Sequence, residues 1–250
     1  MEAGHEFLAR LGKTKLRPGG VEGTNWLLEQ VTLNEDTEVL TVACNRATDM
    51  IMMAERYGCR MTGVDRYRPA LADAATNIAE AGLGHRLKVL RADARNLPFD
   101  DASFDIVMNE AMLTMMTDSS KAACIREYAR VLRPGGALLT HDLCVRDVPA
   151  AVIDELRELL QISVNPLSLS GWTNLFRQNG FCQVHARTGR MHFLTPRALI
   201  EDEGVGGMLR IVRTALATPE DRQRLYAMQR FFRRYRRNLR YITVVSRRKS

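Results

Sequence analysis

The sequence lacks long apolar stretches and paired cysteines, and each absence excludes a class of protein. No run approaches the roughly 20 apolar residues that a membrane-spanning helix needs, so we expect no membrane span. The start of the chain has no apolar core of the signal-peptide type, which favours a cytoplasmic location. The five cysteines are scattered and none forms a Cys-x-x-Cys pair, so we expect reduced thiols and no metal site.

Glycine is absent from one turn where nucleotide-binding folds normally have it. The stretch EVLTVACNRATDMIMMAERYGCRMTGVD, residues 38–65, is typical of a strand, a turn, a helix and a second strand. Its turn places Ala43, Asn45 and Ala47 where glycines usually allow a positive φ. Asparagine tolerates the left-handed region, whereas an alanine forced into it is strained by roughly 1–2 kcal/mol. The turn is therefore either a cofactor-binding turn without glycine or an ordinary strand-to-helix loop.

Short apolar runs alternate with helical stretches along most of the chain. This alternation predicts an α/β fold with a mostly parallel sheet and helices on both faces. Expected strands lie at residues 38–44, 60–65, 87–91, 104–109, 136–143, 181–188 and 241–247. Expected helices lie at residues 48–57, 69–81 and 118–132. The RPGG sequence at residues 133–136 is a turn signal that ends the third helix and starts the fifth strand.

The positive charge is concentrated near the C-terminal end. Residues 221–250 hold eleven Lys and Arg and one acid, whereas the first 220 residues hold 25 basic and 28 acidic residues. An apolar stripe at helical steps runs through the same stretch and predicts a buried helix face. Its members are Leu225, Met228, Phe232, Tyr235 and Leu239. The arginines around it favour a solvated face or an acidic small molecule, and an RNA or acidic partner stays open.

Polar residues follow three of the expected strands, at the sheet edge where ligands of open α/β sheets bind. Asp65 ends the second strand, 22 residues after Ala43, and a carboxylate at that offset accepts hydrogen bonds from both hydroxyls of a ribose. The alternative is a solvent-facing aspartate that caps the next helix. Asp93 follows the third strand and is placed to hold an exocyclic amine of an adenine. Asn109 and Glu110 end the fourth strand.

Four segments carry a resemblance to a known family. They are TGVD at 62–65, ADARNLPFDDASFDIV at 92–107, EYARVLRPGGALLTHD at 127–142 and WTNLFRQNGF at 172–181. In this order and spacing, residues 36–190 resemble the class I S-adenosylmethionine-dependent methyltransferases. The likeness is to the small-molecule branch, which is methyltransferase-11-like and similar to quinone-biosynthesis methyltransferases. It implies a Rossmann-like seven-stranded sheet with an antiparallel last strand, which YITVVSR at 241–247 matches.

The resemblance implies S-adenosylmethionine as cofactor and S-adenosylhomocysteine as its product. The family's first motif usually reads acidic-x-Gly-x-Gly-x-Gly, and all four positions depart from it here. Thr41, at the acidic position, supplies no charge for the cofactor's ammonium group, and Arg46 adds a positive charge near the sulfonium unless it turns outward. The implied cofactor-binding residues are Thr41, Ala43, Cys44, Asn45, Ala47, Asp65, Arg66, Asp93, Ala94, Asn109 and Glu110.

Two residues are candidates for catalysis, Glu110 and His141. Methyl transfer from a sulfonium is an in-line displacement in which the protein aligns the nucleophile and excludes water. A base is needed only where the nucleophile arrives protonated. His141 with its neighbour Asp142 is the more attractive pair, because histidine titrates near neutral pH. The alternatives are a histidine that shapes the site and a glutamate that bonds cofactor or substrate.

The chain is thus expected to transfer a methyl group from S-adenosylmethionine to a small molecule. The basic C-terminal region favours an acidic acceptor. The alternative is a non-catalytic protein on the same fold that binds RNA or an acidic partner, with a degenerate first motif. We expect an N-terminal arm at 1–21 that covers the site, a Rossmann-like domain at 22–191 and 241–250, and a helical insertion at 192–240. The insertion is a second candidate for a cover, or for a homodimer contact.

Overall fold

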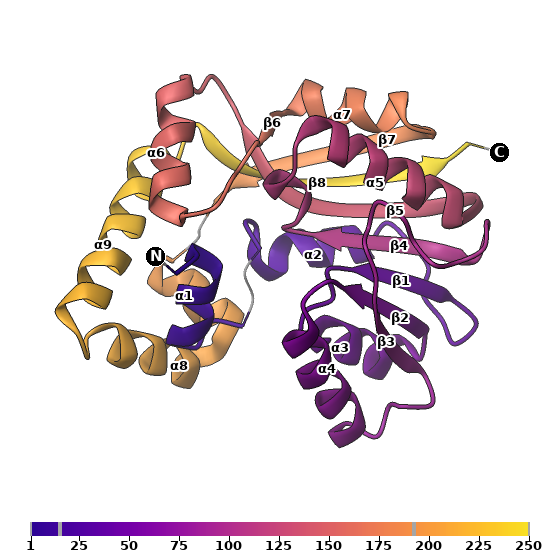
Figure 1. The fold of residues 1–250 in the computed structure, drawn as a ribbon, viewed down its shortest axis with the longest axis horizontal. Coiled ribbons are helices and arrows are strands. Elements are labelled where there is room, and N and C mark those ends of the chain that lie inside the picture. The colour runs from indigo at the N-terminus through magenta and orange to yellow at the C-terminus, as the bar shows by residue number, and fades with distance from the viewer. Residues whose placement is uncertain (1, 15–16, 192–193, 250) are drawn as a thin grey trace.

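The computed structural model describes residues 2–14, 17–191 and 194–249, so parts of the expected arm and insertion, and the last residue of the expected domain segment 241–250, lie outside the described residues. One mixed sheet runs through the molecule, with a group of helices at one end (Figure 1). The strands are β1 Glu38–Val42, β2 Arg60–Asp65, β3 Leu87–Arg91, β4 Phe104–Glu110, β5 Leu132–Val145, β6 Leu167–Ser168, β7 Phe181–Arg190 and β8 Leu239–Arg248. Their order is β3-β2-β1-β4-β5-β8-β7, with the short β6 paired to β5.

The sheet confirms the predicted fold class. β1 to β5 are parallel, and β8 is antiparallel to both of its neighbours, β5 and β7. The helices are α1 Gly4–Leu11, α2 Gly20–Leu28, α3 Thr48–Tyr57, α4 Arg68–Glu80, α5 Asp118–Val131, α6 Ala150–Leu160, α7 Leu169–Gln178, α8 Pro196–Ala215 and α9 Pro219–Arg234, and a 3₁₀ turn spans Leu113–Met115. No helix among the described residues is long and apolar enough to cross a bilayer.

β5 begins four residues before the predicted start at 136. Leu132 pairs with Phe104 and Ala137 pairs with Ile106, so the residues between them bulge out of the strand. The turn predicted at 133–136 therefore exists, but it lies inside the strand and does not precede it. Gly136 is required there, because a Cβ at this position would meet the carbonyl oxygen of Asp105 at 2.9 Å.

Helices cover both faces of the sheet, as the alternation predicted. α5 and α7 pack on one face through Tyr128, Trp172 and Phe176, and α2, α3 and α4 pack on the other (Figure 1). Trp172 lies fully buried, and its indole Nε1 donates a hydrogen bond of 3.0 Å to the carbonyl of Leu143 in β5. These two layers hold the strand ends in fixed positions.

A third apolar cluster joins α1, α6, α8 and α9 into what we call the cap. The parallel strands point toward this cap, while β8 runs away from it (Figure 1). In the N-terminal segment, Phe7, Leu8 and Leu11 are almost completely buried, so α1 is a packed part of the cap. α8 kinks at Gly204, whose φ is 71°.

The predicted stripe in the arginine-rich region is only partly helical. Leu225, Met228 and Phe232 are buried on α9, as the periodicity indicated. Leu239 is also buried, but it belongs to β8, because α9 ends at Arg234. Leu239 fits the helical spacing only by chance, because it is a buried residue at the start of the next strand.

Candidate functional site

Strand register brings the two candidate catalytic residues together. Glu110 at the end of β4 and His141 in β5 are register partners, and Nδ1 of His141 lies 3.0 Å from Oε1 of Glu110. Asp142, one residue further along β5, points to the opposite face, because successive side chains of a strand alternate. Its carboxylate accepts hydrogen bonds from the backbone N–H groups of Thr114 and Leu143. The partner of His141 is therefore Glu110, and not Asp142 as the sequence suggested.

The N-terminal segment closes over this pair. The backbone N–H of Gly19 donates to Nε2 of His141 at 3.0 Å, and the hydroxyl of Thr24 donates to Oε1 of Glu110 at 2.5 Å. Since Nε2 accepts from Gly19, the ring proton resides on Nδ1 and is donated to Glu110. A Cβ at Gly23 would lie 2.5 Å from Cε1 of His141, so only glycine lets α2 approach the ring so closely.

Arg17 lies between two carboxylates. Its Nη1 is 2.8 Å from Oε2 of Glu110 and 2.9 Å from Oδ2 of Asp49, which stands in the first turn of α3. The side chain is only 5% exposed, and its Nε is buried with no hydrogen-bond partner among the described residues. The guanidinium thus keeps one donor free at the site.

The pKa of Glu110 follows from this surrounding. Burial alone would raise the pKa of the carboxyl, but the Arg17 charge and the hydrogen bonds from His141 and Thr24 outweigh burial and lower it to about 2. Glu110 is therefore an anion at every physiological pH. Asp142 behaves in the opposite way, because burial raises its pKa and its hydrogen bonds only partly compensate.

The turn after β1 retains the backbone shape of a glycine-rich turn. Ala43, Asn45 and Ala47 have φ values of 59°, 48° and 59°, all left-handed. The backbone N–H of Asn45 donates to Oδ2 of Asp65 at 3.0 Å, which joins the turn to the end of β2. All three positions thus have the left-handed backbone that glycine normally allows in such a turn, and the two alanines are strained by it.

Comparison with known proteins agrees with this arrangement. The methyltransferase domain family matches residues 39–136. An uncharacterized protein of Haemophilus influenzae is 44% identical over 246 residues, 98% of each chain. Methyltransferase GfsG of Streptomyces halstedii is 33% identical over 143 residues, which are 56% of this chain and 51% of that protein. The chain belongs to the class I S-adenosylmethionine-dependent methyltransferases.

The likeness extends to the methyltransferase fold as a whole. The crystal structure of MccD protein superposes with a TM-score of 0.77 at 19% identity. The aligned residues cover 93% of this chain and 99% of MccD. The cap is thus included in the similarity, together with the sheet. The family assignment predicted from the four segments is confirmed.

The remaining predicted cofactor residues of this methyltransferase lie along the same edge. Asp65 is half-buried, and its second oxygen accepts from the backbone N–H of Tyr67 at 3.0 Å. Arg66 is exposed beside it. Asp93 forms an ion pair of 2.7 Å with Arg95, whose hydrogen bonds lower the pKa of Asp93 to about 2. The carboxylate predicted to meet an adenine amine therefore already holds a guanidinium.

Other members of the predicted set are buried. Ala94 and Cys44 are covered by neighbours, and burial raises the pKa of the Cys44 thiol to about 12, so this cysteine is a packing residue. Asn109 is completely buried, and its Oδ1 has no partner among the described residues. The hydroxyl of Thr41, one residue away across the β1–β4 register, is likewise buried without one.

Arg46 points away from the site. Its guanidinium forms an ion pair of 2.7 Å with Asp73 on α4, and both side chains are largely exposed. The positive charge that the sequence placed near the sulfonium position is therefore turned outward. Among the described residues, no group of three or more His, Cys, Asp or Glu side chains is arranged to hold a metal ion.

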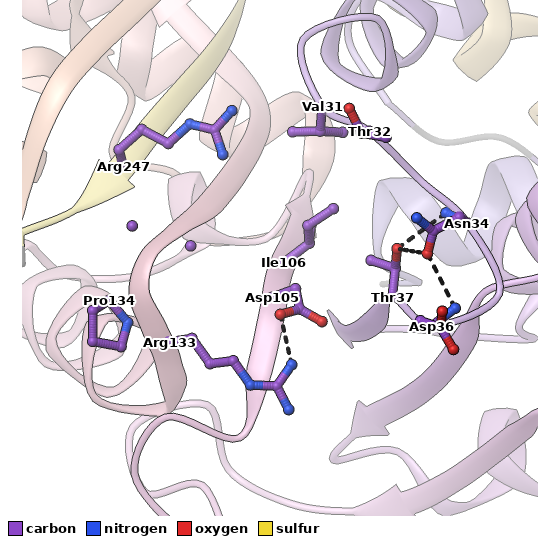
Figure 2. Close-up of a pocket in the computed structure, with 12 residues that line it drawn as sticks. Val31, Thr32, Asn34, Asp36, Thr37, Asp105, Ile106, Arg133, Pro134 and Arg247 are labelled. Atoms are coloured by element: carbon purple, nitrogen blue, oxygen red, sulfur yellow. Dashed lines mark hydrogen bonds and ion pairs between the residues drawn. The ribbon is translucent and has the colours of Figure 1, made fainter.

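Cavities lie at both ends of the parallel strands. A cavity of about 540 Å³ opens at the opposite, amino-terminal ends of β1 and β4, where Figure 2 shows Arg133 reaching Asp105 at 2.6 Å. It shares no residue with the Glu110 cluster. A much smaller cavity, about 30 Å³, lies between Arg17 and Asp202 of α8.

Sequence reasoning missed four members of the cluster around Glu110. They are Arg17, Gly19, Thr24 and Asp49. The RPGG at 17–20 was a usable signal, because a basic residue followed by proline and two glycines is typical of a tight turn that presents backbone to a ligand. Asp49 had no signal, since an acid in the first helical turn is ordinary.

Proposed function

We propose that the protein transfers a methyl group from S-adenosylmethionine to a small-molecule acceptor, with His141 taking the acceptor's proton. The observation that carries the proposal is the Glu110–His141 pair, held at 3.0 Å next to a left-handed β1–α3 turn. The turn fits a nucleoside ligand, and the pair fits general-base chemistry. The acceptor is then a molecule whose nucleophilic atom carries an acidic O–H or N–H.

Several residues fit the donor. The turn at 43–47 brings backbone to the ligand edge, and Asp65 stands next to it for the ribose hydroxyls. Asn109 and Thr41 each hold a buried polar atom that has no partner in the described part of the chain, and a polar ligand at the strand ends would supply one. When bound, S-adenosylmethionine supplies a methyl group already activated by its sulfonium.

His141 is arranged to accept a proton through Nε2. Its other nitrogen donates to Glu110, which stays ionised and therefore stabilises the ring when it becomes charged. In the present conformation the Gly19 N–H occupies Nε2. An acceptor's O–H or N–H would replace that donor, so the segment that carries Gly19 must move aside for substrate and can then cover the site from water.

Arg17 supports an acidic acceptor or an acidic group of the donor. It is a buried cation in contact with Glu110, and its Nε donor has no partner among the described residues. A guanidinium binds carboxylates through paired N–H groups, and burial strengthens that interaction. Arg17 therefore supports two predictions, the cover formed by residues 1–21 and the acidity of the acceptor.

Calorimetry tests the donor part of the proposal. Wild-type protein should bind both S-adenosylmethionine and S-adenosylhomocysteine, and Asp65→Ala should weaken both by at least about tenfold, because a hydrogen-bonded ribose pair is lost. Asp154→Ala removes an exposed aspartate on α6 and should leave binding unchanged. Absence of binding by the wild type would contradict the proposal.

Turnover tests the base. Release of S-adenosylhomocysteine is measured over a set of small acids, phenols and amines, with wild type and His141→Gln. The variant should keep donor affinity and lose at least about a hundredfold in kcat, which is the usual contribution of general-base catalysis. His85→Gln, an exposed histidine, is the matched control. An unchanged rate in His141→Gln would restrict that residue to shaping the site.

Two observations favour a second candidate, a binding protein without catalysis. Asp93 is already neutralised by Arg95, and Thr41 supplies no negative charge at the first motif. Both changes weaken the contacts that a nucleoside donor needs. The same calorimetry separates the candidates, because a protein that has lost the donor site binds neither form of the nucleoside.

A further inference from the structure

The second half of α8 has an apolar face that nothing in the described chain covers. Leu199, Ile211 and Ala215 of the helix are buried in the cap. Four other apolar residues follow each other at steps of four, three and four, and therefore share one face. They are Val205, Leu209, Val212 and Leu216, with exposures of 59%, 58%, 38% and 52%. The apolar surface of α8 therefore extends beyond the part of the helix that the cap buries.

α9 follows after three residues and has a face of arginines that pair with no carboxylate of the described chain. Arg222, Arg230 and Arg233 are exposed and stand on one side of the helix, opposite its buried residues. Tyr226 lies among them and is 58% exposed. Among the described residues, no carboxylate lies within 4.0 Å of these three side chains or of Arg236 and Arg237 beyond the helix.

Two other arginines of the cap do have partners in the described chain. Arg224 on the same helix is turned inward, where it stacks over Phe7 at 4.5 Å and donates to the carbonyl of Glu2. Arg197, at the start of α8, pairs with Glu201. The outer row on α9 differs from these two side chains, because its arginines are exposed and have no carboxylate partner in the described chain.

We propose that the α8–α9 unit docks on the surface of an anionic lipid bilayer. Amphipathic helices that lie in a membrane interface combine an apolar face with a basic polar face and an interfacial aromatic. The exposed face of α8 would enter the boundary between headgroups and acyl chains. The arginines of α9 would bind lipid phosphates, and Tyr226 would lie at the headgroup level. Attachment of this kind needs no spanning helix.

The charge pattern favours a bilayer over the other occupants. A second copy of the chain would bring two rows of unpaired arginines toward each other, and like charges oppose that contact. A single-stranded RNA would bind the arginines and Tyr226, but it would leave the apolar face of α8 in water. Only an interface with negative headgroups above hydrocarbon complements both faces.

Vesicle sedimentation with the full chain tests the proposal. The protein is mixed with vesicles of phosphatidylcholine alone, or of equal parts phosphatidylcholine and phosphatidylglycerol. We expect binding to the anionic vesicles and little to the neutral ones. Arg230→Gln with Arg233→Gln should weaken binding by about tenfold, since each basic residue near an anionic surface contributes to adsorption. Leu209→Ser with Val212→Ser should weaken it to a similar extent.

Matched controls separate docking from general charge. Arg68→Gln with Lys88→Gln removes two exposed positive charges outside the cap and should leave binding unchanged. Circular dichroism melting shows whether each variant is folded. Equal loss in the control pair, or no loss in the Leu209 and Val212 pair, would overturn the proposal. So would failure of the wild type to sediment with anionic vesicles.

The two other occupants are measured in parallel. Light scattering of the free protein reports a dimer, and a mobility shift with single-stranded RNA reports nucleic-acid binding. A dimer that Leu209→Ser with Val212→Ser dissociates would assign the apolar face to a second copy. RNA binding that is lost in the arginine pair, without vesicle binding, would assign the arginines to RNA. Either result would contradict the bilayer proposal.

Discussion

Replacing Ala43 with glycine should stabilise the protein, although glycine usually does the opposite. Ala43 has a φ of 59° in the β1–α3 turn, where an L-residue with a Cβ is strained by about 1–2 kcal/mol. Glycine removes that strain, while the greater freedom of its unfolded chain reduces stability by about 0.4–1 kcal/mol. The net change is a gain of about 0.5–1 kcal/mol, or a few degrees in Tm for a chain of this size.

The matched substitution is Ala75→Gly in the middle of α4. Ala75 is exposed and helical, so glycine there should reduce the free energy of unfolding by about 1 kcal/mol. Urea unfolding of wild type and both variants, followed by circular dichroism, gives the comparison. The two Ala→Gly changes should act with opposite sign. If Ala43→Gly is as destabilising as Ala75→Gly, Ala43 is not strained by its left-handed backbone.

Three further predictions concern the site and the core. Glu110→Gln should lower the free energy of unfolding by about 3 kcal/mol at neutral pH, because the folded pKa of Glu110 is depressed to about 2. This loss of stability should shrink as the pH falls from 4.5 to about 2, and urea unfolding at several pH values measures it. Gly23→Ala should cost about 1–3 kcal/mol through its clash with His141, whereas Gly206→Ala, with open space around it, should be neutral or stabilising in the same assay. Trp172→Phe should cost about 1–3 kcal/mol by leaving the Leu143 carbonyl unpaired, as thermal unfolding would show.

Each of these has an outcome that contradicts it. A pH-independent deficit in Glu110→Gln would mean that the carboxyl titrates normally in the folded state. Equal effects of alanine at Gly23 and Gly206 would mean that α2 does not press on the His141 ring. A fully stable Trp172→Phe would mean that water reaches the carbonyl of Leu143.

The fold was largely predictable because its signals are local. Strand and helix periods, Pro69 at a helix start and Gly58 at a helix end depend on neighbours in sequence, and α3 begins and ends where predicted. The start of β5 was misplaced, because a bulge opposite Asp105 depends on the register of another strand. The end of the apolar stripe was misplaced for a similar reason, since Leu239 is buried by the sheet.

The candidate site could be predicted only for the residues that lie at the ends of strands. Asp65, Asn109, Glu110 and His141 follow apolar runs, so their common edge could be inferred from the parallel sheet. Pairing His141 with Asp142 failed because neighbours on a strand face opposite ways, and the true partner comes from the register with β4. The turn at 17–20 is visible in the sequence, but the partners of Arg17 could not be inferred, because they lie more than thirty residues away in the chain.

The position of β8 constrains how the chain becomes a sheet. β8 lies between β5 and β7, and both of these neighbours are synthesised before it. While residues 239–248 are still inside the ribosome, two strands present open backbone edges that invite pairing with other chains. β8 can therefore insert only after residues 239–248 have left the ribosome, and a chain that stopped before residue 239 would leave a split sheet prone to aggregation.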